Sequence, residues 1–197
     1  MSLPNILTYA RIAAIPVVVG CIYAQAIMDG PLWLRWVALA VFIAAGVTDY
    51  LDGYYARIWK QHSAFGRMLD PIADKLLVAS CLLMLAADDT IKGRAVWAAI
   101  VILCREILVS GLREYLAELR VSVPVTQLAK WKTAAQLLAI GFLLAGLAGD
   151  NVVSGLIGHD TRLITNTGIG LLWLSALVTL YTGYDYFRAG VRHLINE

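Results

Sequence analysis

Four aspartates lie close together in a chain that is otherwise strongly apolar. They form two pairs, Asp49 with Asp52 and Asp70 with Asp74, whose members are three and four residues apart. On helices, both spacings put the two side chains on one face. Four converging carboxylates repel one another unless a cation compensates them, and hard divalent cations prefer oxygen ligands. The pattern therefore predicts a site for one or two divalent metal ions, of the kind used in phosphoryl transfer.

Small residues accompany the first aspartate pair. Gly53 and Ala56 extend the face of Asp49 and Asp52 by one turn with almost no side chain. Glycine destabilises a helix by about 1 kcal/mol relative to alanine, so its presence suggests that a ligand approaches the backbone closely. Arg57 adds a planar cation suited to a phosphate oxygen. Gly66 fits either the same clearance or a turn between two helices, and the spacing leaves both alternatives open.

The elements that position these residues are predicted to be membrane helices. The chain is 60% apolar and 15% charged, whereas soluble domains carry about 25% charged residues. A helical span takes about 20 apolar residues, so 197 residues hold roughly six spans and leave no room for a separate soluble domain. The sequence thus predicts an all-α polytopic membrane protein with a single domain, 1–197. Its six transmembrane helices are expected at residues 6–28, 32–57, 70–88, 94–117, 127–149 and 163–187, with Asp150–Arg162 as a loop.

Basic residues predict the orientation of these helices. With both termini in the cytoplasm, most Lys and Arg lie inside, and the basic residues left outside are Arg35, Lys92, Arg94 and Arg162. This distribution satisfies the positive-inside rule. The aspartates then lie at the cytoplasmic ends of the second and third helices. Further charges on the fourth and fifth helices gather on the same side, which predicts one polar cavity open to the cytoplasm: Arg105, Glu106, Arg113, Glu114, Lys130 and Lys132.

The aspartates, the small residues and the arginine together form a longer motif. Its pattern is Asp-x2-Asp-Gly-x2-Ala-Arg-x8-Gly-x3-Asp-x3-Asp, from Asp49 to Asp74 without a gap. This motif resembles the signature of the CDP-alcohol phosphatidyltransferases, which are six-helix membrane enzymes. The resemblance implies that an alcohol attacks the β-phosphorus of a CDP-linked lipid and displaces CMP. It also implies two Mg²⁺ or Mn²⁺ ions held by Asp49, Asp52, Asp70 and Asp74, with Asp74 as general base, and a CDP-lipid site at Gly53, Ala56, Arg57 and Gly66.

Other stretches indicate which alcohol is used. LPNILTYARI, CREILVSGLREYLAEL and LAKWKTAAQ resemble bacterial members of the family that transfer to glycerol 3-phosphate, the first step of phosphatidylglycerol synthesis. An acceptor with its own phosphate needs additional cations, and Arg105, Arg113, Lys130 and Lys132 are the candidates. Arg105 and Arg113 share a helix face. Lys130 and Lys132 are two residues apart and cannot both point inward on a regular helix. We therefore favour Arg113 and Lys132 as contacts of the acceptor. The alternative is that these basic residues only set the membrane topology or bind anionic lipid headgroups.

A polar stripe runs along the start of the first helix, where Asn5, Thr8 and Arg11 recur at three-residue intervals. The stripe fits a helix start that lies in the headgroup layer. It fits equally a contact with the CDP-lipid by Asn5 and Thr8, which the resemblance suggests. Three aromatic residues near the C-terminus are interpreted as interfacial or packing residues rather than ligand contacts: Trp173, Tyr181 and Tyr184.

Competing functions differ in acceptor or in class. The same chemistry with inositol, inositol phosphate or serine is the near alternative, although a neutral acceptor would leave the basic residues without a substrate phosphate. A divalent-cation transporter is the alternative of another class, because acidic membrane residues also bind transported ions. Against it, the aspartates gather at one predicted membrane face rather than near mid-depth. The family resemblance further implies a homodimer and a bacterial inner-membrane location. The orientation predicted from the basic residues puts the active site on the cytoplasmic side, and no nucleic-acid partner is expected.

Overall fold

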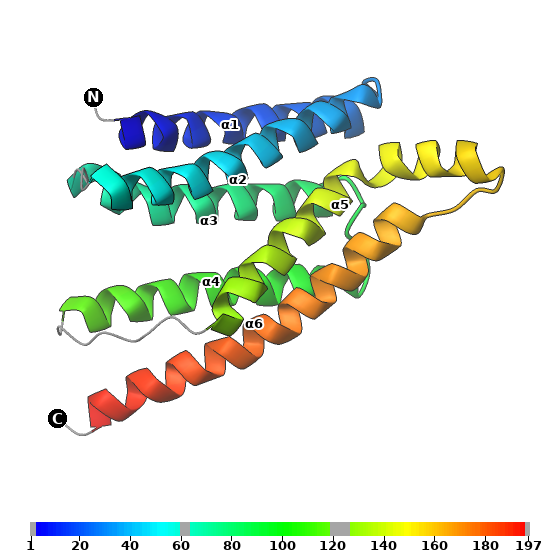
Figure 1. Cartoon of the computed structure of the whole chain (residues 1–197). Coiled ribbons are helices and arrows are strands. Elements are labelled where there is room, and N and C mark those ends of the chain that lie inside the picture. Colours follow the sequence, from blue (N-terminus) through cyan, green and yellow to red (C-terminus); the bar gives the residue numbers. More distant parts are fainter. Residues whose placement is uncertain (1–2, 60–63, 119–126, 196–197) are drawn as a thin grey trace. The chain divides into compact units, whose positions relative to one another are not determined.

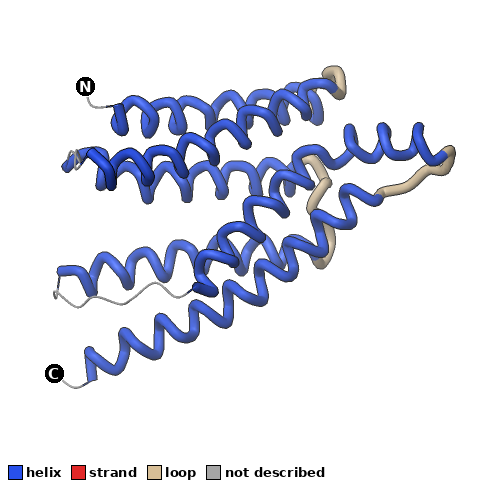
Figure 2. The backbone as a smooth tube through the Cα atoms, in the orientation of Figure 1, coloured by secondary structure: helices blue, strands red, loops and turns tan. Residues whose placement is uncertain are grey.

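The computed structural model describes residues 3–59, 64–118 and 127–195, and these consist of helices and connecting loops without a strand (Figures 1 and 2). The expected all-helical class is therefore confirmed for the described residues. Six helices follow one another along the chain: α1 Leu3–Ala26, α2 Trp33–Trp59, α3 Ala64–Ala87, α4 Ala95–Glu118, α5 Gln127–Ile157 and α6 Leu163–Ile195.

Helix α3 begins earlier than the sequence suggested. It starts at Ala64 rather than at residue 70, so Gly66 lies in its first turn and Pro71 lies inside the helix. Proline lacks the amide hydrogen of one helical hydrogen bond, which makes it resemble a helix start in the sequence. Membrane helices tolerate such a proline because neighbouring groups satisfy the freed carbonyl. Gly66 is thus a helical residue, and only the clearance alternative remains for it.

Helix α5 is longer than predicted, and the expected loop over 150–162 is wrong for residues 150–157. The helix continues to Ile157 through a kink at Gly146, whose φ of 25° and ψ of −111° are not helical. A positive φ favours glycine. Asp150 was expected to begin the loop, but its carboxylate accepts hydrogen bonds from the backbone amides of Ile164 and Thr165 at 2.7 and 3.2 Å. It therefore caps the start of α6, where a carboxylate is favourable.

The chain packs as two compact units. The first comprises residues 1–91 and 140–168, and the second comprises residues 92–139 and 169–197. In the first unit α1 packs against both α2 and α3 (Figure 1). Its core is built from apolar side chains of these helices: Val18, Ile22, Ala38, Phe42, Leu77 and Leu85. In the second unit the core residues include Ala98, Ile102, Val109, Leu116 and Leu172.

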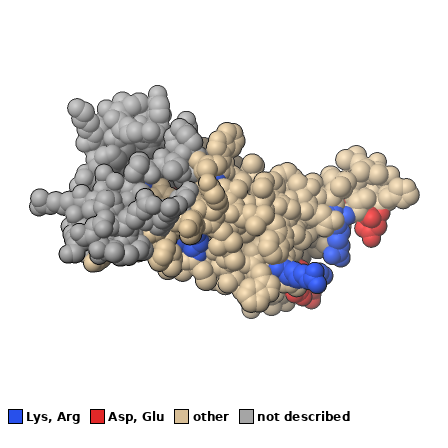
Figure 3. All heavy atoms as spheres, turned by 90° about the horizontal axis from the view of Figure 1, so that it is seen from below, with Lys and Arg blue, Asp and Glu red and all other residues tan. Residues whose placement is uncertain are grey.

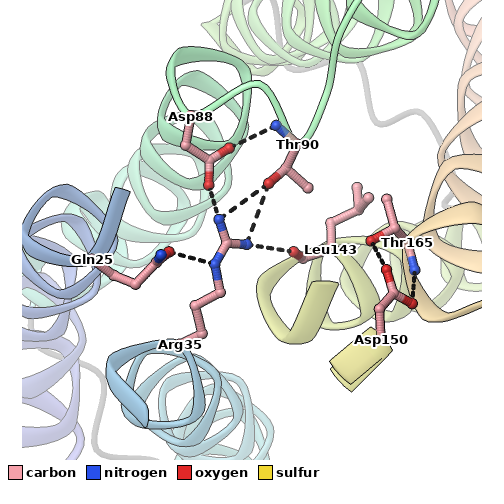
Figure 4. Close-up of polar contacts among 7 residues, drawn as sticks. All are labelled: Gln25, Arg35, Asp88, Thr90, Leu143, Asp150 and Thr165. Atoms are coloured by element: carbon pink, nitrogen blue, oxygen red, sulfur yellow. Dashed lines mark hydrogen bonds and ion pairs between the residues drawn. The ribbon is translucent and has the colours of Figure 1, made fainter. Parts of the chain in front are cut away.

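A buried arginine ties several elements of the first unit together (Figure 4). Arg35, near the start of α2, forms an ion pair with Asp88, which follows α3. Its guanidinium also donates to Gln25 at 2.6 Å and to the Leu143 carbonyl of α5 at 3.5 Å. A Cβ atom at Gly146 would come within 3.2 Å of this guanidinium. The network thus fixes the kink of α5 against the ends of α2 and α3.

The described surface has the apolar character of a membrane protein. Large apolar side chains are exposed on every helix, among them Tyr23, Trp36, Leu83, Trp97, Trp131 and Leu177. On the face drawn in Figure 3, few of the side chains outside the grey region are charged. Among the described residues, four helical segments are long and apolar enough to cross a bilayer: Leu7–Ala26, Ala95–Ala117, Trp131–Ile157 and Leu163–Tyr184. A shorter apolar segment is Trp33–Thr48. These observations indicate a multi-pass membrane protein.

Candidate active site

The aspartate motif is carried by α2 and α3. Asp49 and Asp52 lie in α2, and Asp70 and Asp74 lie in α3. Both pairs are therefore helical, as their spacing predicted, and each pair shares a helix face. Residues 60–63 alone separate the two helices, so the end of α2 must lie near the start of α3.

Most side chains of the motif lie outside the described part of the structure. This holds for every side chain from residue 49 to residue 67 and for Asp70, as well as for Asn5 and Lys130. The metal ligands Asp49, Asp52 and Asp70 thus remain predictions. So do the CDP-lipid contacts at Gly53, Ala56, Arg57 and Gly66. Among the described side chains, no three of His, Cys, Asp and Glu meet in a way that could hold a metal ion.

Asp74 is the motif carboxylate whose surroundings are described. Its Oδ1 accepts a hydrogen bond from Nη1 of Arg11, on α1, at 3.0 Å. The Arg11 side chain is fully buried, whereas 49% of the Asp74 side chain is exposed. The ion pair compensates the buried guanidinium and orients the carboxylate. Arg11 thus contacts the Asp74 carboxylate, and about half of the Asp74 side chain is exposed.

Two residues of the polar stripe, Thr8 and Arg11, face the interior of the first unit. Thr8 and Arg11 are both buried, and they continue the buried face that Val18 and Ile22 form further along the helix. This burial contradicts a position in the headgroup layer for these two side chains. A contact between Thr8 and the CDP-lipid stays a prediction. The contact of Arg11 with Asp74 could not be predicted, because the spacing of polar residues along α1 does not show which helix they face.

A second charged cluster lies in the second unit, on α4 and α5. The Glu106 carboxylate accepts a hydrogen bond from Nζ of Lys132 and lies 3.6 Å from Nη1 of Arg105. Arg105 and Lys132 are buried, and Glu106 is partly buried. A buried charge needs a partner, and Glu106 supplies one for both cations. Sequence reasoning placed Glu106 near these cations but assigned it no role.

Helix α6 holds the same arginine from the other side. Nη2 of Arg105 donates to Oγ1 of Thr182 at 3.0 Å. The Arg105 side chain lies so close to Gly183 that a Cβ there would meet its Cγ at 3.0 Å and its Nε at 3.3 Å. The glycine thus creates the space in which the arginine chain lies.

One aromatic ring of α6 completes the cluster. The guanidinium carbons of Arg105 and Arg113 lie 5.9 and 5.5 Å from the centroid of the Tyr186 ring. The two arginines therefore share a face of α4, as their spacing predicted. Tyr186 is buried, whereas Tyr181 and Tyr184 of the same helix are exposed. Sequence reasoning missed Tyr186, although its four-residue spacing from Thr182 puts both on one face.

The cluster has the composition of an anion site. The cluster contains three of the four predicted acceptor-phosphate residues, Arg105, Arg113 and Lys132. The side chain of the fourth, Lys130, is not described. Among the described contacts they face one carboxylate, that of Glu106. The excess positive charge suits a phosphate, which guanidinium groups bind through paired hydrogen bonds.

Comparison with known proteins adds an independent finding. The family model described as CDP-alcohol phosphatidyltransferase matches residues 1–181. A protein of Rickettsia bellii named CDP-diacylglycerol–glycerol-3-phosphate 3-phosphatidyltransferase is 43% identical over 188 residues, covering 95% of this chain and 94% of that protein. A protein of Cereibacter sphaeroides with the same name is 39% identical and covers 100% and 98% of the two chains. A rice protein named cardiolipin synthase (CMP-forming) is 36% identical, covering 95% of this chain and 57% of that protein.

Proposed function

The chain belongs to the CDP-alcohol phosphatidyltransferase family, and we propose that it transfers the phosphatidyl group of CDP-diacylglycerol to glycerol 3-phosphate. The products are phosphatidylglycerophosphate and CMP. One observation carries this proposal: relatives whose names state this reaction are 39–43% identical over nearly the whole length of both chains. The motif from Asp49 to Asp74 supports the chemistry, and the cluster around Arg105 supports an acceptor that carries a phosphate.

The proposed setting is the inner membrane of a bacterium. We take α1 to α6 as six spans, and among the described residues four of these helices contain a segment long and apolar enough to cross a bilayer. The positive-inside rule favours both termini, and hence the aspartates, on the cytoplasmic side. A polar cavity open to that side is part of the proposal.

The donor set of the motif fits hard divalent cations. Four carboxylates provide oxygen ligands at helical spacing, which suits two Mg²⁺ or Mn²⁺ ions at Asp49, Asp52, Asp70 and Asp74. Such ions, when bound, offset the charge of the pyrophosphate and polarise the attacked phosphorus. The half-exposed Asp74 carboxylate agrees with a residue that meets both a cation and a substrate.

Asp74 is the proposed general base. Its carboxylate accepts the proton of the glycerol 3-phosphate hydroxyl as that oxygen bonds to the β-phosphorus of the CDP-lipid. The bond from this phosphorus to the bridging oxygen breaks, and CMP leaves with the electron pair. Arg11 keeps the carboxylate in position through its 3.0 Å contact.

The two substrates are assigned to different residues of the chain. We assign the CDP-lipid to the small residues and the arginine of the motif and to the start of α1: Gly53, Ala56, Arg57, Gly66, Asn5 and Thr8. The acceptor phosphate is assigned to Arg105, Arg113, Lys130 and Lys132. Gly53→Leu tests the first assignment, because a branched side chain would fill the clearance. The KM for CDP-diacylglycerol should rise while the protein remains folded, and an unchanged KM contradicts the assignment.

A lipid acceptor is the second candidate, because the rice relative is named a cardiolipin synthase. Its identity to this chain is lower than that of the two bacterial relatives, and this favours glycerol 3-phosphate. Both candidates keep the metal site and the base, and they differ in the acceptor alone.

Release of CMP tests the proposal. Purified protein in detergent receives CDP-diacylglycerol and Mg²⁺ with glycerol 3-phosphate, inositol, inositol phosphate, serine or phosphatidylglycerol. Release with glycerol 3-phosphate alone, lost on chelation, is the expected result. Release with inositol or serine, which carry no phosphate, moves the basic cluster back to a topological role. No release with any acceptor contradicts the enzyme assignment and directs attention to ion flux in liposomes. The homodimer expected for the family is tested separately by light scattering after size-exclusion chromatography.

A further inference from the structure

The ring of Tyr186 contacts two cations that lie two turns apart on α4. Arg105 and Arg113 are eight residues apart, which corresponds to about 12 Å along a helix axis. Both guanidinium groups nevertheless lie within 6 Å of the same ring centroid, at 5.9 and 5.5 Å. The negative face of an aromatic ring attracts cations, and this attraction offsets part of the repulsion between the two like charges.

The two arginines depend on the ring to different degrees. Arg105 is buried, and it also contacts Thr182 and Glu106. Arg113 is exposed, and within the described part of the chain the ring of Tyr186 is the contact recorded for its guanidinium. An arginine side chain held by nothing else loses much rotamer freedom when it binds a ligand. The ring removes part of that cost in advance, and it does so mainly for Arg113.

We propose that Tyr186 is a positioning residue of the acceptor site, which holds Arg113 beside Arg105 so that both guanidinium groups meet the phosphate of the acceptor. The proposal rests on the proposed function, in which these arginines bind glycerol 3-phosphate. Tyr186 acts through the arginines and does not itself contact the substrate. The face of its ring, rather than its hydroxyl group, carries the effect.

Substitutions of Tyr186 separate the ring from the hydroxyl group. Tyr186→Leu should raise the KM for glycerol 3-phosphate about tenfold, because a desolvated cation–π contact has a strength of that order. The KM for CDP-diacylglycerol should stay unchanged, which shows that the protein is folded. Tyr186→Phe keeps the ring and should behave like the unaltered enzyme. Tyr184→Leu is the matched control, since Tyr184 lies on the same helix and is exposed.

A double-mutant cycle tests whether Tyr186 acts through Arg113. Arg113→Ala alone should raise the KM for glycerol 3-phosphate, and adding Tyr186→Leu should raise it little further, because coupled residues are not additive. Additive effects overturn the proposal. Equal rises in the KM for both substrates also overturn it, since they indicate a purely structural role.

The same experiments distinguish this inference from the function on which it rests. If Arg113→Ala leaves the KM for glycerol 3-phosphate unchanged, the acceptor site itself is wrong. If Arg113→Ala raises it and Tyr186→Leu does not, Tyr186 has no positioning role. Should Tyr186→Leu fail to fold, pentafluorophenylalanine at position 186 keeps the shape of phenylalanine but removes the negative face. A KM above that of Tyr186→Phe then supports the proposal, and an equal KM overturns it.

Discussion

The Nη1 atom of Arg11 lies 3.0 Å from Oδ1 of Asp74, although 63 residues separate the two in the sequence. The contact joins α1, which carries no part of the aspartate motif, to the last aspartate of that motif. The buried arginine and the half-exposed carboxylate differ in their accessibility. This difference agrees with the proposed roles, in which Arg11 positions the carboxylate and Asp74 accepts the proton.

Loss of Arg11 should therefore lower turnover more than substrate affinity. We expect Arg11→Ala to reduce kcat about 10–100-fold, the range found when a residue that orients a reacting or ligating group is removed. Arg11→Lys should recover part of the rate, because lysine keeps the positive charge but lacks the planar guanidinium group of arginine. The measurement is CMP release at saturating substrates. Arg94→Ala, at an exposed arginine, is the control, and equal rates for Arg11→Ala and this control contradict the positioning role.

Loss of the Asp74 carboxylate should have a larger effect. Asp74→Asn removes the proposed base while keeping the shape, and kcat should fall at least about 100-fold. Binding of CDP-diacylglycerol should partly survive, because the other motif residues remain. Asp89→Asn is a matched control, since Asp89 is exposed and its φ of 58° is one that asparagine tolerates. Full activity of Asp74→Asn excludes its role as base.

Removal of divalent cations tests the metal site independently of any substitution. Chelation should abolish CMP release, and added Mg²⁺ or Mn²⁺ should restore it. Protein folding, followed by circular dichroism, should not change with chelation, because the helices are held by packing across buried faces. Activity that persists after exhaustive chelation rules out a metal-dependent reaction.

A larger residue at position 183 should change the KM for glycerol 3-phosphate and leave the KM for CDP-diacylglycerol unchanged. A methyl group at this position would lie 3.0 Å from Cγ of Arg105 and would push the side chain aside. Overfilling of a packed contact costs about 1 kcal/mol or more, so Gly183→Ala should raise the KM for glycerol 3-phosphate about fivefold. Gly170→Ala is the control on the same helix, because a Cβ there meets nothing within 4 Å. An equal KM for the two variants contradicts the assignment of Arg105 to the acceptor.

The helices and the motif were predictable because their signals are local. The apolar segments of the sequence predicted the six helices of the described residues, and two of the helix ends were misjudged. Pro71 resembled a helix start although it lies inside α3, and Asp150 resembled a loop residue although it caps α6. The spacing of the motif aspartates shows which of them share a helix face, because this property is local. The roles of the motif residues come from the family resemblance and stay predictions.

The partners of the functional residues could not be predicted, because they depend on packing between distant segments. Arg11 lies in a short polar stripe on a mainly apolar helix, and the sequence of that helix does not say which neighbour the stripe meets. Tyr186 differs from Tyr184 in burial, a property that follows from the rotation of α6 against α4. Glu106 could be placed near the basic residues, but its pairing with Lys132 required the positions of two helices.

The buried ion pair of Arg35 and Asp88 should be important for stability rather than for the reaction. Arg35→Leu leaves the Asp88 carboxylate buried without its cation, and loss of one partner of a buried pair costs about 3–5 kcal/mol. The midpoint of thermal unfolding in detergent should fall clearly. Adding Asp88→Asn should recover part of the loss, because it removes the uncompensated charge and keeps an acceptor for the Thr90 amide. Lys92→Ala, at an exposed residue of the same connection, is the control, and an Arg35→Leu midpoint equal to it contradicts the role of the pair.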